Sequence, residues 1–172
     1  MAIRHAGLYG GVDAVVSVSG PARWFYRDTV PMRQVHWAIE RPAGRLAARL
    51  VKRTRIAAGG WDPLPAAPHE VIGRIAPTPV LIVHGDADRF FPPEHAEQLY
   101  AAAGEPRELW LERGFGHAET AATPDLIKRI GGWLVAAPAP TTGKGDNNRP
   151  IGAGPGSSRY GAMSDEYGSR ET

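Results

Sequence analysis

The chain has 172 residues, of which 42% are hydrophobic and 22% charged, values that suit one globular domain with a real core. It contains no cysteine, so a disulfide framework, a thiolate nucleophile and a cysteine-ligated metal are excluded. Its apolar runs have the length of strands, and no signal-peptide pattern follows Met1. We therefore expect no membrane span and a cytoplasmic location, although the formal net charge of +2 excludes little.

The N-terminal segment predicts a helix followed by a buried strand. Residues Ala2–Tyr9 are typical of the last turns of a helix, and Gly10-Gly11 is a stop signal. The run Val12–Ser19 is almost continuously apolar and rich in β-branched residues. Such runs are typical of strands that are buried on both faces of a parallel sheet.

The next segment, about residues 22–73, is longer than a simple crossover between two strands needs. It predicts two helices, over Pro31–Glu40 and Gly44–Arg55. Between residues 23 and 55 its basic residues far outnumber its acidic ones, which are Asp28 and Glu40. These cations are Arg23, Arg27, Arg33, Arg41, Arg45, Arg49, Lys52, Arg53 and Arg55. They form solvated helix faces or attract nucleic acid, anionic lipid or an acidic substrate; no nucleic-acid-binding motif accompanies them, so we expect no nucleic-acid partner.

Alternating strands and helices then return. Strands are predicted over Pro79–His84 and Arg107–Glu112, and helices over Glu94–Ala103 and Pro124–Val135. This alternation predicts an α/β fold, with a parallel sheet covered by helices on both faces.

The C-terminal end changes in composition. Residues 138–172 are rich in proline, glycine, serine, threonine and asparagine. Such a segment buries too little apolar surface to offset its ordering entropy, so it is predicted to be disordered. The folded domain is then expected over residues 1–137.

Two glycine-containing polar loops follow the second and third predicted strands, at the edge of a parallel sheet where ligands bind. The first has the pattern Gly-x-x-Asp-x-x-x-Pro and the second Gly-x-Gly-His. The matching residues are Gly85, Asp88 and Pro92, and then Gly114, Gly116 and His117. Both loops resemble the acid and histidine loops of the α/β-hydrolase superfamily, whose catalytic triad follows the order Ser, Asp or Glu, His.

The resemblance implies a catalytic role for Asp88 and His117. His117 would take a proton from a serine and return it to the leaving group. Asp88 would hold the imidazole tautomer and stabilise the imidazolium. Asp86 is the competing acid, and we expect it instead to stabilise its own loop by local hydrogen bonds.

The nucleophile of that family is not found in the sequence. No Gly-x-Ser-x-Gly motif is present, and four of the six serines lie in the C-terminal tail. Ser17 and Ser19 lie in or at the end of the first strand rather than on a strand-to-helix turn. The resemblance implies that Ala2–Tyr9 ends the helix that the serine begins. We therefore expect the chain to be the C-terminal part of an α/β-hydrolase fold, with its serine upstream of Met1.

The segment 22–73 takes the place of the helical cap of that family. Trp24, Phe25 and Trp37 are candidate substrate-binding residues, together with Tyr26 and Trp61, or they pack the cap helices on the sheet. Among the other histidines, we expect His84 to anchor its loop and His95 to lie on an exposed helix. The histidine spacing suits no metal site, so neither a metal nor another cofactor is expected.

The leading functional hypothesis is hydrolysis of an ester or related bond in a small-molecule substrate, by the Ser-Asp-His mechanism that the resemblance implies. The alternative is a catalytically inactive fragment or binding module. A third hypothesis, nucleic-acid binding by the basic segment, predicts salt-sensitive affinity that depends on Arg49 and Arg53.

Overall fold

The computed structural model describes residues 1–118 and 122–138. The predicted disordered tail lies, from residue 139 on, outside the described residues. The elements in chain order are α1 (Ala2–Tyr9), β1 (Val15–Val18), α2 (Val30–Glu40), α3 (Pro42–Val51), α4 (Pro68–Val71), the 3₁₀ helix η1 (Ile72–Ile75), β2 (Val80–Gly85), α5 (Glu94–Ala102), β3 (Arg107–Glu112) and α7 (Pro124–Ala136).

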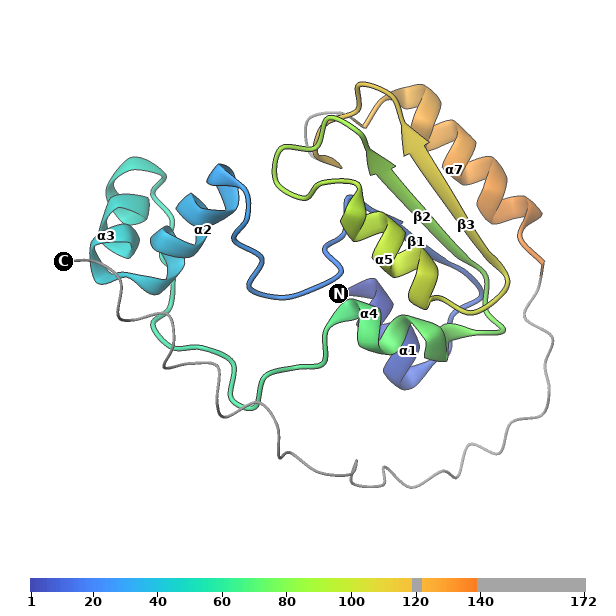
Figure 1. Cartoon of the computed structure of the whole chain (residues 1–172), viewed down its shortest axis with the longest axis horizontal. Helices are drawn as coiled ribbons and strands as arrows, with labels where there is room; N and C mark the ends of the chain where they lie inside the picture. The colour runs from blue at the N-terminus through green and yellow to red at the C-terminus, as the bar shows by residue number, and fades with distance from the viewer. Residues whose placement is uncertain (119–121, 139–172) are drawn as a thin grey trace. The chain divides into compact units, whose positions relative to one another are not determined.

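The three strands form one parallel sheet in the order β1-β2-β3, as Figure 1 shows. In the register, Val15 pairs with Val80 and Val80 with Arg107, so all three strands run in step. The predicted parallel α/β fold is therefore confirmed. The first strand is shorter than predicted, because pairing with β2 begins only at Val15.

Side chains of β2 alternate between two apolar clusters, one on each face of the sheet. On one face Val80 and Ile82 pack with residues of α1, α4, η1 and α5, among them Ile3, Ile72 and Leu99. On the other face lie Leu81, Val83, Phe115, Leu126 and Ile130, the last two from α7. Figure 1 shows α7 and α5 on opposite faces. Burial on both faces explains why β2 is apolar over nearly its whole length.

The end of the predicted cap segment packs in the core. Val71 and Ile72, on α4 and η1, are fully buried and contact the cluster around Ile3. Short helical turns over residues 68–75 were not predicted, since four residues are too few to show a helical period. The last residues of the predicted cap range therefore contribute to the core beside the sheet.

Helix α3 was predicted over Gly44–Arg55 but spans Pro42–Val51. Arg41 has extended backbone angles, as expected for a residue before proline, and Pro42 occupies the first helical turn. At the other end Arg53 has a φ of 52°, in the left-handed region, which is incompatible with a continuing helix. The apolar period alone did not show these two boundaries.

Candidate active site

The loops after β2 and β3 are joined by hydrogen bonds at the carboxyl edge of the sheet. Asp86 N–H donates to the carbonyl of Glu112 at 3.2 Å, and Ala87 N–H to that of Phe115 at 3.1 Å. The carboxylate of Asp86 accepts a bond of 2.6 Å from Gly114 N–H. Asp86 was predicted to stabilise its own loop, but it ties the two loops together, a contact over 28 residues that local sequence does not reveal.

Glycine at position 85 permits this close approach. A Cβ atom on Gly85 would lie 1.9 Å from the carbonyl oxygen of Phe115, far inside van der Waals contact. Gly114, at the turn of the second loop, has a φ of 66°, which a residue with a side chain adopts only with strain. Glycine is therefore required at position 85 by the close approach of the second loop and is favoured at position 114 by its positive φ.

Asp88 has a fully buried side chain surrounded by hydrogen-bond donors. Its Oδ1 accepts bonds from the backbone N–H of Phe90 at 2.8 Å and of Phe91 at 3.1 Å. Its Oδ2 lies 2.9 Å from Nδ1 of His117. One oxygen thus stabilises the loop, and the other is directed at the imidazole.

His117 is a partly exposed imidazole whose orientation is set by Asp88. The side chain is 23% exposed. When Nδ1 carries the proton and donates it to Asp88, Nε2 carries the lone pair and can accept a proton from a hydroxyl group. The rings of Phe90 and Phe91 lie 5.0 and 5.8 Å from the imidazole. This combination of buried carboxylate, oriented imidazole and apolar walls is suited to general-base chemistry.

His84, on β2, anchors the loop that carries Asp88, as predicted. It is fully buried, and its Nε2 lies 2.8 Å from the carbonyl oxygen of Phe91. The same nitrogen is 3.8 Å from Oδ2 of Asp88. His84 therefore stabilises the loop conformation that presents Asp88.

His95 was predicted to lie on an exposed helix, but it is only 2% exposed. Its Nδ1 accepts the N–H of Ala22 at 3.1 Å, and its ring packs edge-on against Tyr26 at 4.4 Å. Burial lowers the pKa of His95, and the positive charge of Arg23 lowers it further. The apolar pattern of α5 did not predict this burial, because the first turn of the helix is covered by a distant segment of the chain, the start of the insertion around Ala22.

The three aromatic residues predicted to bind substrate do not form one cluster. Trp24 donates from Nε1 to the carbonyl of Pro65 at 2.8 Å and packs against Trp61 at 5.2 Å. Phe25 is 52% exposed and also contacts Trp61. Trp37 lies apart from them on α2 and is 50% exposed. Trp24 and Trp61 line a groove of about 330 Å³ beside β1 and the first residues of α1.

A second groove, of about 460 Å³, lies beside the acid loop and was not predicted. It is lined by Pro31, Gln34, Val35 and Ala38 of α2 and by Arg89 and Phe90. Thr29 ties the start of α2 to this loop by donating to the carbonyl of Phe90 at 3.0 Å. Phe90 thus borders this groove and also contacts the ring of His117 at 5.0 Å. The Phe90-Phe91 pair inside the polar loop is the sequence signal that could have indicated it.

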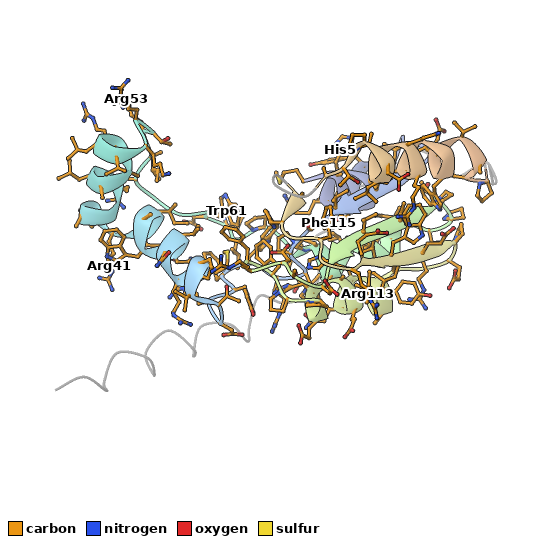
Figure 2. The ribbon with its side chains drawn as sticks, turned by 90° about the horizontal axis from the view of Figure 1, so that it is seen from above. His5, Arg41, Arg53, Trp61, Arg113 and Phe115 are labelled. Carbon is orange, nitrogen blue, oxygen red and sulfur yellow. The ribbon has the colours of Figure 1, made fainter. Side chains whose placement is uncertain are left out.

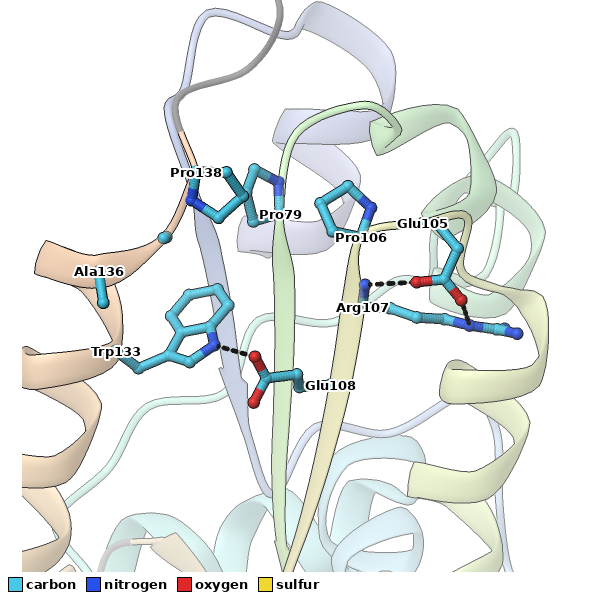
Figure 3. A pocket seen from close by; sticks show the side chains of 9 residues that line it. Pro79, Glu105, Pro106, Arg107, Glu108, Trp133, Ala136 and Pro138 are labelled. Carbon is cyan, nitrogen blue, oxygen red and sulfur yellow. Dashed lines mark hydrogen bonds and ion pairs between the residues drawn. The ribbon is translucent and has the colours of Figure 1, made fainter.

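A further cavity, of about 180 Å³, lies at the opposite edge of the sheet (Figure 3). Pro79 and Pro106, which precede β2 and β3, line it together with Trp133 of α7. Its polar groups are already paired: Trp133 donates to Glu108, and Arg107 to Glu105. This cavity is therefore separate from Asp88 and His117. No group of three potential metal ligands occurs within residues 1–118 and 122–138.

Ser17 and Ser19, the two serines among the described residues, are both buried. Ser19, directly after β1, is 3% exposed and has a φ of 51°. Its hydroxyl has no hydrogen-bond partner among the described residues, so His117 does not engage it. Ser17 is a buried strand residue beside Gly20.

Comparison with known proteins gives a consistent picture of the fold. No family model matches the chain. A segment of 40 residues is 45% identical to the uncharacterized protein YfhR of Escherichia coli K12, over 23% of this chain and 14% of that protein. The described structure resembles the α/β hydrolase GrgF from Penicillium sp. sh18, with 18% identity and a TM-score of 0.55 over 79% of this chain and 59% of that one.

It also resembles the esterase domain of a Rhodothermus marinus protein, with 19% identity and a TM-score of 0.52 over 78% of this chain and 53% of that one. The chain thus spans little more than half the length of these two structures. No described helix has the length and apolar character needed to cross a bilayer. From its parallel sheet, flanking helices and helical insertion, the chain has the fold of the α/β-hydrolase superfamily over part of that fold's length.

Proposed function

We propose that Asp88 and His117 are the acid and base of a hydrolase site for esters or related bonds, whose serine nucleophile lies upstream of Met1 in a longer protein. The single observation that carries the proposal is the 2.9 Å contact between His117 Nδ1 and the fully buried Asp88 carboxylate. A partly exposed histidine oriented in this way by a buried acid is the arrangement that activates a hydroxyl group.

In this mechanism Nε2 of His117 removes the proton of the attacking hydroxyl and later protonates the leaving group. Asp88 stabilises the imidazolium formed between these two steps. The groove between α2 and Phe90 receives the apolar part of the substrate, because Phe90 borders it and also contacts the ring of His117. The similarity to an α/β hydrolase and an esterase domain supports the reaction class.

The first test concerns the length of the natural protein. We expect the reading frame upstream of Met1 to encode a Gly-x-Ser-x-Gly motif and the native protein to be larger than 18.5 kDa. A native mass of 18.5 kDa, with no such motif upstream, would contradict the proposal. It would favour the alternative of a non-catalytic module.

The second test measures activity of the longer protein on p-nitrophenyl butyrate. His117→Ala is expected to lower kcat by about 10⁴-fold or more, since removal of the base disables the whole constellation. His5→Ala is the matched control, because His5 is an exposed histidine on α1 that contacts only the ring of Tyr9 among the described aromatic residues. Equal activity of the two variants would sink the proposed role of His117.

A further inference from the structure

The outer faces of α2 and α3 expose large apolar side chains. Leu46 is 57% exposed, Leu50 71% and Val51 76%, and Trp37 on α2 is 50% exposed. Leu46 and Leu50 are four residues apart and so lie on one face of α3. Ordinary surface helices of globular proteins direct such residues toward a core rather than toward solvent.

The inner face of α3 is already used. A Cβ atom on Gly44 would lie 2.3 Å from the carbonyl oxygen of Trp37 and 2.7 Å from Cα of Ala38, so the two helices cross closely at this glycine. On a helical projection Leu46 and Leu50 lie away from Gly44. Their exposure is therefore not a consequence of loose packing between α2 and α3.

Cations surround these apolar residues. Between residues 30 and 55 the sequence has seven arginines and lysines and one carboxylate, Glu40. Glu40 is itself paired with Arg27 and His36, and its pKa is lowered because these contacts outweigh the effect of burial, which raises it. Arg49 lies three residues after Leu46 and directly before Leu50 on α3, and Arg53 follows two residues after the end of that helix.

The charge of this surface is not compensated. Arg45 donates to the carbonyls of Ile39 and Glu40 at the end of α2. In the part of the chain that the structure describes, no carboxylate pairs with Arg41, Arg49, Lys52 or Arg53. Figure 2 shows Arg41 and Arg53 near opposite ends of α3, with their side chains directed away from the ribbon.

We propose that the exposed apolar and basic side chains of α3 and its C-terminal end (Leu46, Leu50 and Val51 with Arg49, Lys52 and Arg53), together with Trp37 of α2, bind membranes that contain anionic lipid. Aliphatic side chains enter the boundary between headgroups and acyl chains, and the arginines remain at the lipid phosphates. Trp37 is suited to the same boundary because its ring is amphipathic.

Charge and apolarity together select this partner. A second copy of the chain would bring two cationic surfaces together, which is unfavourable. Nucleic acid would satisfy the arginines but would leave Leu46, Leu50 and Val51 against phosphates and sugars. An anionic bilayer satisfies both kinds of side chain. The inference does not depend on the proposed hydrolase activity, because it uses neither Asp88 nor His117.

The test is co-sedimentation of the 172-residue chain with vesicles of phosphatidylcholine alone or with 30% phosphatidylglycerol. We expect binding to the anionic vesicles and little binding to neutral ones, with affinity falling as NaCl rises. Arg49→Gln/Arg53→Gln is expected to weaken binding about 25-fold at low salt, or about fivefold for each cation. Leu46→Ser/Leu50→Ser is expected to weaken it about tenfold.

Matched controls change the same residue types elsewhere. Arg74→Gln/Arg113→Gln removes two exposed arginines that have no described ion pair, and Ile127→Ser/Leu134→Ser removes two exposed apolar residues of α7. Neither control is expected to change vesicle binding by more than about twofold. Circular dichroism verifies that each variant is folded. If the double leucine substitution unfolds the hairpin of α2 and α3, the double arginine substitution still tests the proposal.

Three results would overturn the proposal. These are equal binding to neutral and anionic vesicles, losses of binding in the control pairs as large as those in the test pairs, and tighter binding to a DNA duplex than to anionic vesicles. The DNA result would assign the surface to nucleic acid instead. Quenching of tryptophan emission by brominated lipid, reduced in Trp37→Phe, is expected if Trp37 enters the bilayer.

Discussion

The loops that carry Asp88 and His117 differ from the hairpin formed by α2 and α3 in how their polar side chains are paired. Both regions are rich in polar residues and lie at the surface. In the loops, Asp88 is buried, each oxygen of its carboxylate is bonded, and backbone bonds join the two segments. In the hairpin of α2 and α3, Leu46 and Leu50 are exposed, and no carboxylate among the described residues pairs with Arg49. Buried polar groups require partners, whereas exposed ones do not. Paired polar groups therefore hold the loops together, whereas the hairpin leaves apolar and basic side chains exposed.

The largest expected change in the free energy of unfolding comes from replacing a closely packed glycine, and it differs between the loops and the hairpin. Gly85→Ala places Cβ against the carbonyl of Phe115 and is expected to lower the free energy of unfolding by about 3 kcal/mol. Gly44→Ala has a similar clash, but only between α2 and α3. It is expected to increase protease cleavage in the hairpin and to leave the unfolding of the sheet nearly unchanged.

Urea unfolding followed by tryptophan fluorescence measures the first effect. Gly131→Ala is the control, since no atom lies within 4 Å of its added Cβ and alanine favours helix α7 by about 0.5–1 kcal/mol. A wild-type unfolding midpoint for Gly85→Ala would show that the two loops do not need their close approach.

Removal of the carboxylate at position 88 is the next largest change. Asp88→Ala leaves the N–H groups of Phe90 and Phe91 without their acceptor, so we expect a loss of about 2 kcal/mol. Asp88→Asn is expected to recover part of it, because an amide oxygen can accept both bonds. Denaturant unfolding of the two variants checks this order, and equal stability of Asp88→Ala and wild type would contradict it.

Acid is expected to destabilise the contact between His95 and Ala22. Burial and then the charge of Arg23 lower the pKa of His95, so the folded state favours the neutral imidazole that accepts the Ala22 N–H. This contribution to stability is complete above the ordinary histidine pKa of about 6.5 and is lost as pH falls from there through the folded-state pKa.

Unfolding free energies at pH 7.5 and pH 5.5 measure this loss. In His95→Gln the difference between the two pH values is expected to be smaller than in the wild-type chain. His5→Gln is the control, since His5 is exposed and its replacement is expected to leave the pH difference as it is. An unchanged difference in His95→Gln would assign the acid sensitivity to other groups.

The smallest effect is expected in the hairpin. Arg27 and Glu40 form an ion pair of 2.6 Å, but their side chains are 52% and 37% exposed. Arg27→Gln should therefore cost less than about 1 kcal/mol, and added salt should reduce even that. A loss as large as that of Asp88→Ala would show that the hairpin depends on polar contacts as strongly as the loops do.

The strands and most helices could be predicted from local pattern because burial imposes the pattern directly. Arg107–Glu112 is a strand over the predicted residues, and α7 differs from its prediction by one residue at its end. Boundaries failed where local backbone chemistry outweighed the apolar period, as at Pro42 and Arg53 around α3.

By itself, the sequence determined the α/β class and predicted the two polar loops that hold Asp88 and His117, since motif and strand pattern are local properties. Only the tertiary structure decided that Asp86 joins the loops, that His95 is buried under the insertion, and that the ring of Phe90 contacts the imidazole. Each of these depends on segments far apart in the chain whose approach is set by packing. A hydrogen bond across 28 residues, or a helix turn covered by a segment 73 residues away, leaves no periodic signal in the sequence.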